Sequence, residues 1–184
     1  MVSRVSEIGE ITRLSDALDS FRCCLDEDIE DFLRHKAIQF LERGWCSVYL
    51  IVDGDSFANG KIDIVAYFTL SHKAIIPQFA SKTAIRKTSG FKDSEVISFV
   101  LIGHLGKYKK REDFDHSKVV SVSISICEIL DFAFEVIKES SNLIPCRCVL
   151  VECSDNQKVQ FGYKKYGFKD FQFDGSHYQL YKEI

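Results

Sequence analysis

The sequence has few of the features that mark disordered, fibrous or membrane-embedded chains. It contains only two prolines in 184 residues, and 46% of its residues are hydrophobic, which excludes disordered and collagen-like polypeptides. No uninterrupted apolar run approaches the roughly 20 residues that a membrane-spanning helix needs. Residues 1–10 also lack the apolar block of a signal peptide. We therefore expect a cytoplasmic globular protein that does not bind membranes.

The cysteines and histidines lack the spacing of a metal site or a disulfide framework. The number of cysteines is odd, and no two of them form a CxxC pair. The histidines show no metal-ligand spacing either. We expect no metal, and we expect reduced thiols, most of them buried, at Cys23, Cys24, Cys46, Cys127, Cys146, Cys148 and Cys153.

The net charge gives no global attraction to polyanions, and the organisation of the chain indicates one domain. The formal net charge of -3 leaves only local basic clusters as sites for nucleic acid. The chain has no internal repeat, low-complexity run or linker rich in proline or serine. We therefore predict a single domain over residues 1–184.

The first half of the chain predicts helices followed by a β-hairpin. Apolar residues recur at helical spacing over residues 28–42, after a shorter helix over 14–21, and Gly44 ends the pattern. Two strand-like runs, 47–52 and 62–70, flank a stretch rich in glycine, aspartate and asparagine. This pattern is typical of a hairpin with a long turn. Residues 71–94 show no clear pattern.

The second half alternates strands and helices. Residues 96–105 are apolar at nearly every position, which predicts a central strand covered on both faces. The basic stretch 107–118 is predicted to be a loop. Further segments are predicted as a helix over 125–139, a strand over 147–153, a helix capped by Asp155 and ending at Gly167, and strands over 168–173 and 177–182 around the turn at Asp174 and Gly175. The fold class is α+β, with a mixed, mostly antiparallel central sheet flanked by helices.

Three separated segments, in this order, carry a resemblance to a known family. They are Phe21–Leu70, Val100–Lys110 (VLIGHLGKYKK) and Val151–Phe171 (VECSDNQKVQFGYKKYGFKDF). Together they resemble the GNAT family of acetyl-CoA-dependent N-acetyltransferases, and the first segment is similar to the subgroup that includes toxins of toxin–antitoxin pairs. The resemblance implies a central sheet with helices on both faces.

The resemblance implies residues that hold acetyl-CoA as a cosubstrate. The backbone at Leu101, Ile102, Gly103 and Leu105 would pair with the pantetheine arm like an added strand. Asn156 matches a residue that hydrogen-bonds the same arm, and the alternative is an asparagine that caps a helix or forms a turn.

The loop that would hold the pyrophosphate departs from the family. Its usual signature contains glycines that let the backbone approach phosphate, whereas residues 108–125 contain no glycine. Lysine charge and serine hydroxyls would take the place of these contacts at Lys107, Lys109, Lys110, Ser123 and Ser125. The alternative is a solvated basic loop.

Two residues are candidates for catalysis. Tyr163 matches the tyrosine that protonates the departing CoA thiolate, and the alternative is an aromatic side chain that packs beside Tyr166 and Phe168. His104, on the predicted central strand, can deprotonate an amine near neutral pH. The alternative for His104 is a buried histidine bonded to a backbone carbonyl.

The resemblance implies transfer of an acetyl group to a primary amine, with the acceptor unidentified. Through its toxin subgroup, the resemblance implies aminoacyl-tRNA as one possible acceptor. It also implies an antitoxin protein and a second copy of the chain as candidate partners. The glycine-free loop keeps a second hypothesis open, that of a catalytically inactive GNAT-like module that binds a protein or senses a ligand.

Overall fold

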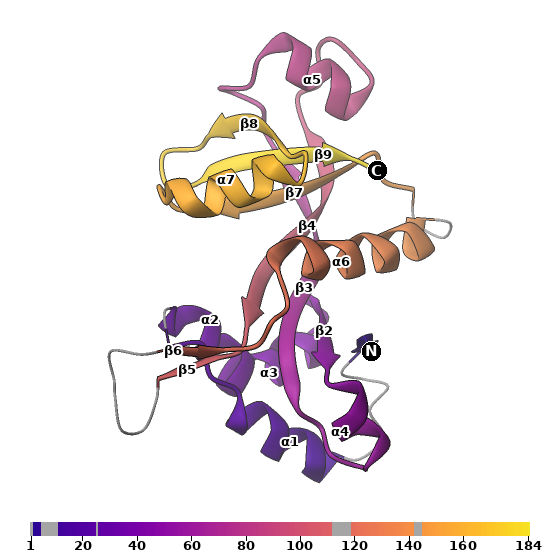
Figure 1. Cartoon of the computed structure of the whole chain (residues 1–184). Helices are drawn as coiled ribbons and strands as arrows, with labels where there is room; N and C mark the ends of the chain where they lie inside the picture. The colour runs from indigo at the N-terminus through magenta and orange to yellow at the C-terminus, as the bar shows by residue number, and fades with distance from the viewer. Residues whose placement is uncertain (1, 5–10, 25, 112–118, 142–144) are drawn as a thin grey trace. The chain divides into compact units, whose positions relative to one another are not determined.

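The computed structural model describes residues 2–4, 11–24, 26–111, 119–141 and 145–184 (Figure 1). The chain divides into two compact units, of which the first comprises Met1–Thr69 and His104–Ile129 and the second Leu70–Gly103 and Leu130–Ile184. Three elements contribute residues to both units: β3 (Ile64–Ile75), β4 (Ile97–Lys107) and α6 (Ile126–Ser141).

The other elements belong to one unit each. The first unit holds β1 (Val2–Arg4), α1 (Ile11–Ser20), α2 (Glu27–Asp31), a π-helical turn (Phe32–Lys36), α3 (Ala37–Glu42), β2 (Ser47–Val52), α4 (Gly54–Ala58), β5 (Lys109–Arg111) and β6 (Val119–Ser121). The second unit holds α5 (Lys82–Ser89), β7 (Cys148–Cys153), α7 (Gln157–Lys165), β8 (Lys169–Phe173) and β9 (Tyr178–Glu183).

The helices of the first unit pack one apolar face against its strands, which follow the order β1-β2-β3-β4. Elements α2, the π-helical turn and α3 form one continuous run, which confirms the predicted helix, and Gly44 ends it with φ 68°. The hairpin of β2 and β3 is also confirmed, with α4 inside its long turn. The core of this unit combines Leu14, Leu18, Phe21, Phe32, Leu33, Val48, Leu50, Ile64 and Tyr67.

A close contact fixes the start of α2 on the sheet of the first unit. The Tyr67 hydroxyl donates a hydrogen bond of 2.6 Å to the carbonyl oxygen of Ile29. A Cβ atom at Gly106 would lie 2.4 Å from Ile29 Cγ2 and 2.8 Å from Tyr67 Cε1. Only glycine therefore fits at this position, because real Cβ atoms do not approach other atoms so closely.

The basic stretch predicted as a loop contains a strand. Residues Lys109–Arg111 pair antiparallel with Val119–Ser121, and Lys109 also bridges in parallel to Cys23. The Lys109 N–H donates to the Arg22 carbonyl at 2.8 Å, and the Cys24 N–H donates to the Lys109 carbonyl at 3.1 Å. The prediction was wrong because backbone pairing does not require apolar side chains. Residues 112–118 lie outside the described part of the chain.

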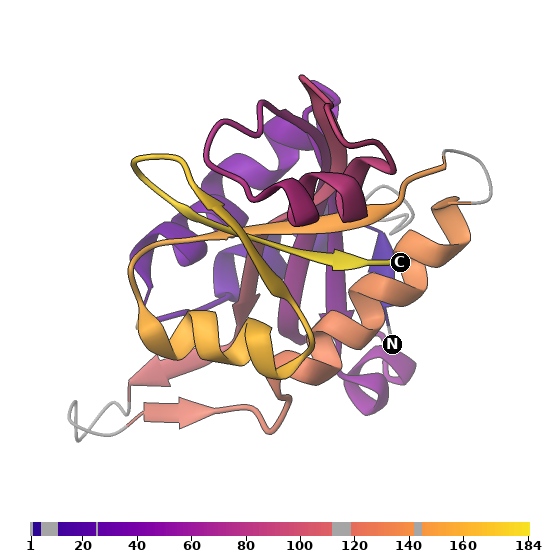
Figure 2. The same ribbon diagram turned by 90° about the horizontal axis from the view of Figure 1, so that it is seen from above.

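The second unit confirms the predicted crossover. Strand β4 pairs in parallel with β7, with Leu101 opposite Leu150, and α6 connects the two strands. Strand β9 pairs antiparallel with both β7 and β8, so the strand order of this unit is β3-β4-β7-β9-β8. Within this unit, Figures 1 and 2 show α7 and the second-unit part of α6 on one face of the strands and α5 on the other, as the α+β prediction requires.

Three local predictions need correction in the second unit. Strand β4 is not covered along its whole length, because Ser98 and Gly103 are exposed. The unpatterned segment 71–94 contains the end of β3 and all of α5, which begins after the cap Ser81. Helix α7 is capped by Asn156 and not by Asp155, although both residue types can accept the bonds that a cap supplies.

All seven cysteines are free thiols, but fewer are buried than predicted. Cys23, Cys148 and Cys153 are buried, and the other four are half-buried. Burial raises the pKa of the Cys23 thiol to about 11 and that of Cys148 to about 12. Among the described residues, no helix is long and apolar enough to cross a membrane.

Candidate functional site

The predicted site residues fall in both units. Those of the first unit are His104, Leu105, Lys107, Lys109, Lys110, Ser123 and Ser125. Those of the second unit are Leu101, Ile102, Gly103, Asn156 and Tyr163. Each group is described within its own unit.

His104 lies in an aromatic environment at the end of β4. Its ring stacks on Phe32 with centroids 3.7 Å apart and planes at 12°. Burial lowers the pKa of His104, so the imidazole is neutral at pH 7. Within the described residues neither ring nitrogen has a hydrogen-bond partner, which argues against a histidine satisfied by a backbone carbonyl. A neutral imidazole with free nitrogens can accept a proton.

Lys107 forms hydrogen bonds with the backbone segment that precedes α6. Its Nζ atom donates to the Ile124 carbonyl at 2.9 Å and to the Val122 carbonyl at 3.4 Å. Two backbone carbonyls thus already contact the charge that the sequence analysis assigned to phosphate. The side chain of Lys109 is half-buried and that of Lys110 is exposed.

Ser125 begins α6 with a capping box. The Glu128 N–H donates to Ser125 Oγ at 3.2 Å, and the Ser125 N–H donates to Glu128 Oε2 at 2.8 Å. These bonds to Ser125 lower the pKa of the exposed Glu128 carboxyl, which therefore stays charged. Ser123, two residues earlier, is exposed. A negative charge thus lies at the helix end where the resemblance places a pyrophosphate.

The strand residues predicted to pair with the pantetheine arm differ in exposure. Leu101 and Ile102 are paired with Leu150 and Val151 of β7. Gly103, which follows them, is exposed and carries no side chain that would screen its backbone. In the first unit, Leu105 is half-buried.

Asn156 serves as the N-cap of α7. Its Oδ1 atom accepts hydrogen bonds from the N–H groups of Lys158 at 3.1 Å and Val159 at 3.4 Å. The helix-cap interpretation of the sequence is therefore realised. Because the cap uses only the carbonyl of the amide, the exposed Nδ2 group keeps its two donor hydrogens for a ligand.

Tyr163 is buried near the end of α7 and packs edge-on against Phe168, with ring centroids 5.6 Å apart. Its hydroxyl has no hydrogen-bond partner in the described part of the chain. Burial, and to a smaller extent the nearby Cys153, raises the pKa of this phenol above its usual value of about 10. The hydroxyl is therefore a protonated donor.

Side chains from four strands of the second unit form a polar row that no sequence pattern indicates. Lys73 Nζ lies 2.6 Å from Glu152 Oε2, and Gln179 Nε2 donates to Glu152 Oε1 at 2.7 Å. Gln172 Nε2 extends the row by donating to Gln179 Oε1 at 2.9 Å. Because Lys73 and Glu152 are 79 residues apart, no local pattern could reveal the pair. Both carboxylate oxygens of Glu152 are occupied by these contacts.

The fold is shared with solved structures of bacterial toxins. AtaT in complex with acetyl-methionyl-tRNAfMet aligns with a TM-score of 0.70 and 16% identity, over 100% of this chain and 94% of that one. A KacT variant aligns with a TM-score of 0.71 and 18% identity, over 100% and 94%. The chain has the GNAT fold. The structure of AtaTR bound with acetyl-CoA also shares this GNAT fold, with a TM-score of 0.67 and 15% identity, over 100% and 92%.

Sequence comparison adds nothing to this structural likeness. No protein-family model matches the chain, and no curated protein matches it. With identities of 14–18%, the GNAT fold is shown while the activity is left to the site residues.

Proposed function

We propose that the chain is a cytoplasmic, acetyl-CoA-dependent N-acetyltransferase that acts as one domain and transfers an acetyl group to a primary amine. The observation that carries this proposal is the alignment of the whole chain with GNAT-fold toxins, including one solved with acetyl-CoA. The buried Tyr163 and the neutral His104 support it, because they supply a proton donor and a proton acceptor.

The residues present fit acetyl-CoA better on the thioester side than on the phosphate side. The exposed Gly103 and the free amide donors of Asn156 suit the amide-bearing pantetheine arm. Lysine charge at Lys109 and Lys110 and the hydroxyl of Ser123 would face the phosphates. Lys107 and Ser125, on either side of them, form hydrogen bonds with backbone groups of the same unit. Charge and hydroxyls then replace the backbone contacts of a glycine-rich loop.

Acetyl-CoA, when bound, supplies an acetyl group activated as a thioester. The neutral His104 ring accepts the proton that the amine loses when its nitrogen attacks the carbonyl carbon. Tyr163 gives its hydroxyl proton to the sulfur as the carbon–sulfur bond breaks, and its raised pKa keeps that proton in place until a thiolate forms. The products are an acetylated amine and free CoA.

The solved structures of AtaT suggest an acceptor and a partner, which we propose for this chain. AtaT was solved with acetyl-methionyl-tRNAfMet, which makes the amine of an aminoacyl-tRNA our first acceptor to test. AtaT was also solved with the C-terminus of the antitoxin AtaR, so an antitoxin is the partner to seek. A homodimer of the chain is proposed alongside.

A second candidate function is a module that has lost catalysis and binds a protein or senses a ligand. The capping box with Glu128 favours it, because that carboxylate opposes an anion at the start of α6. The two functions predict different behaviour toward acetyl-CoA.

Calorimetric titration with acetyl-CoA, combined with a CoA-release assay on aminoacyl-tRNA and small primary amines, tests the proposal. We expect micromolar binding that weakens when Lys109 and Lys110 are both changed to alanine. The matched control changes Lys138 and Lys165, two exposed lysines on α6 and α7, to alanine. Binding without CoA release on any amine would favour the ligand-sensing module, and no binding would refute the enzyme.

A further inference from the structure

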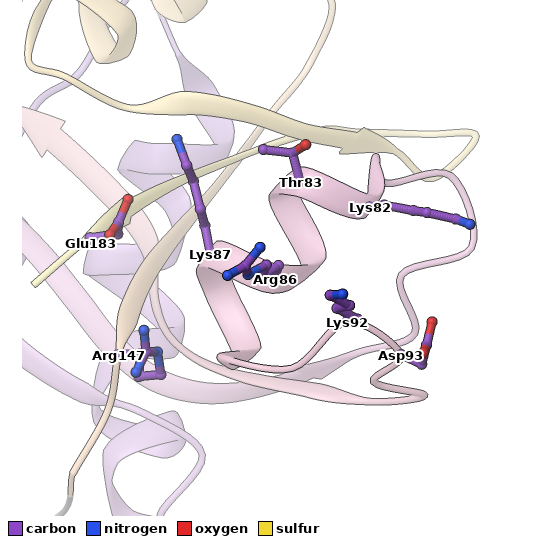
Figure 3. Close-up of a pocket in the computed structure, with 8 residues that line it drawn as sticks. All are labelled: Lys82, Thr83, Arg86, Lys87, Lys92, Asp93, Arg147 and Glu183. Carbon is purple, nitrogen blue, oxygen red and sulfur yellow. The ribbon is translucent and has the colours of Figure 1, made fainter.

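The second unit contains a basic pocket that none of the proposed site residues lines. It has a volume of about 700 Å³ and lies between α5, the segment that follows it and the start of β7 (Figure 3). Five cations and two carboxylates line it, together with Thr83; the cations are Lys82, Arg86, Lys87, Lys92 and Arg147, and the carboxylates are Asp93 and Glu183. The excess of positive charge is local, because the whole chain carries a net charge of -3.

These five cations have no ion-pair partner among the residues that the structure describes. Within the described part of the chain, none of their side chains forms an ion pair or a hydrogen bond. Glu183, the last residue of β9 and one of the two carboxylates that line the pocket, pairs instead with Lys169, at 3.5 Å. Like charges gathered without partners repel one another, so the arrangement is stabilised when an anion enters.

The end of α5 leaves room for one of the two arginines of the pocket. Helix α5 ends at Gly90 with φ 85°, and the Arg147 guanidinium lies 3.6 Å from the position where a Cβ of residue 90 would be. The glycine thus leaves room for Arg147 beside the helix end, and Figure 3 shows Arg86 facing Arg147 across the pocket. Paired guanidinium groups match the oxygen geometry of phosphate.

An exposed aromatic ring stands at the same loop. Phe91 precedes the pocket residue Lys92, and 74% of its surface is exposed. Ser89 fixes this turn, since its Oγ atom accepts from the Phe91 N–H at 3.0 Å and donates to the Phe91 carbonyl at 2.9 Å. An aromatic ring beside unpaired cations is the combination on which bases stack while phosphates are bound.

We propose that this pocket binds the phosphate groups of a nucleotide, either free or within a single RNA strand, with the base stacking on Phe91. The two carboxylates favour a nucleotide over an acidic peptide, because ribose hydroxyls and base amino groups can donate to Asp93 while a row of carboxylates would be repelled. A second cavity of about 500 Å³ shares Lys87, Arg147 and Glu183, which gives room for more than one phosphate. The proposal does not depend on acetyl transfer.

The test compares two matched double variants of the full chain. One changes Lys82 and Lys87 of the pocket to glutamine, and the control changes the exposed Lys138 and Lys165 to glutamine. Binding of ATP, of a 12-nucleotide single-stranded RNA and of poly-glutamate is measured by calorimetry and fluorescence anisotropy at two salt concentrations. Acetyl-CoA binding is measured on the same proteins.

We expect the pocket variant to bind the nucleotide ligand about 10-fold more weakly than the control, because charge-assisted contacts to phosphate are lost. A loss confined to ATP identifies a free nucleotide, and a loss confined to RNA identifies a strand. Equal binding by both variants, no nucleotide binding, or binding of poly-glutamate alone would overturn the proposal. Changing Phe91 to alanine should weaken RNA binding further and leave the fold intact, since this ring is exposed. Acetyl-CoA affinity should be the same in all variants, which separates this inference from the proposed enzyme.

Discussion

The imidazole of His104 lies flat against the ring of Phe32, with centroids 3.7 Å apart. Phe32 is the first residue of the π-helical turn and is itself buried. The ring removes one face of the imidazole from water, and burial lowers the His104 pKa more than the nearby carboxylates of Asp26 and Asp28 raise it. Phe32 therefore helps to keep His104, the proposed base, in its neutral form.

This stacking predicts a titration below the usual range. In an NMR titration, His104 should have its midpoint below pH 6.5, and changing Phe32 to leucine should move that midpoint upward as water reaches the ring. The matched control changes Tyr49, which stacks on Phe68, to leucine and should leave the midpoint unchanged. A midpoint at or above 6.5 in the native protein would contradict the expectation.

The same shift predicts how stability depends on pH. Because the folded state lowers the pKa of His104, the unfolded chain binds more protons once the pH falls below about 6.5. The contribution of His104 to the free energy of unfolding should therefore be highest above pH 6.5, and it should fall as the solution is acidified. Urea unfolding at pH 7 and pH 5 should show a smaller loss in a His104→Gln variant than in the native protein.

Changing Tyr163 to phenylalanine should lower the rate of CoA release about 100-fold, because the departing sulfur loses its proton donor. Acetyl-CoA affinity should stay the same, since the hydroxyl acts on the leaving group. The control is Tyr166→Phe, which removes only a hydroxyl that donates to Asp131 at 2.7 Å and should cost at most about 1 kcal/mol of stability. Full turnover in the Tyr163 variant would mean that water protonates the sulfur.

Changing Gly106 to alanine should lower the free energy of unfolding by about 1–3 kcal/mol, because the added methyl group overlaps Ile29 and Tyr67. Gly54 offers the matched control, since a Cβ there meets nothing within 4 Å and its φ is not positive. Gly54→Ala should change stability by no more than about 0.5 kcal/mol. Equal urea midpoints for the two variants would show that α2 can move away from the sheet at little cost.

Changing Glu128 to glutamine should strengthen acetyl-CoA binding about 2- to 5-fold at low salt, because a negative charge leaves the end of α6 where phosphate is proposed to bind. Glutamine can keep the capping box, so the helix should remain intact. Glu135→Gln, on an exposed position of the same helix, is the control. Unchanged affinity for both variants would place the phosphates away from this helix end.

Local pattern predicted most of the elements. Strand β2 was predicted to the residue as 47–52, because its β-branched and aromatic side chains fill a buried strand. Strand β5 could not be predicted, since Lys109–Arg111 form a strand only by pairing with Val119–Ser121 and with the chain near Cys23. A pairing with a distant segment leaves no trace in a basic tripeptide.

Two of the predicted site residues have structural contacts that the sequence does not indicate. Lys107 and Ser125 were expected to contact phosphate, yet the folded backbone gives the first two carbonyl partners and the second a capping box. These roles depend on where orphan backbone groups lie, which one sequence does not reveal. The basic pocket could not be predicted for the same reason, because Arg147 comes close to α5 only in the folded chain.

The burial of the thiols also determines how readily each cysteine reacts with oxidants and alkylating agents. The thiolate is the form of cysteine that reacts with peroxides and alkylating agents. The raised pKa of Cys23 and Cys148 keeps both sulfurs protonated at neutral pH. The half-buried Cys24, Cys127 and Cys146 have more contact with solvent. Mass spectrometry after brief alkylation should find these three modified first, while Cys23 and Cys148 react only when the chain unfolds. The protein thus carries its own internal reporter of unfolding.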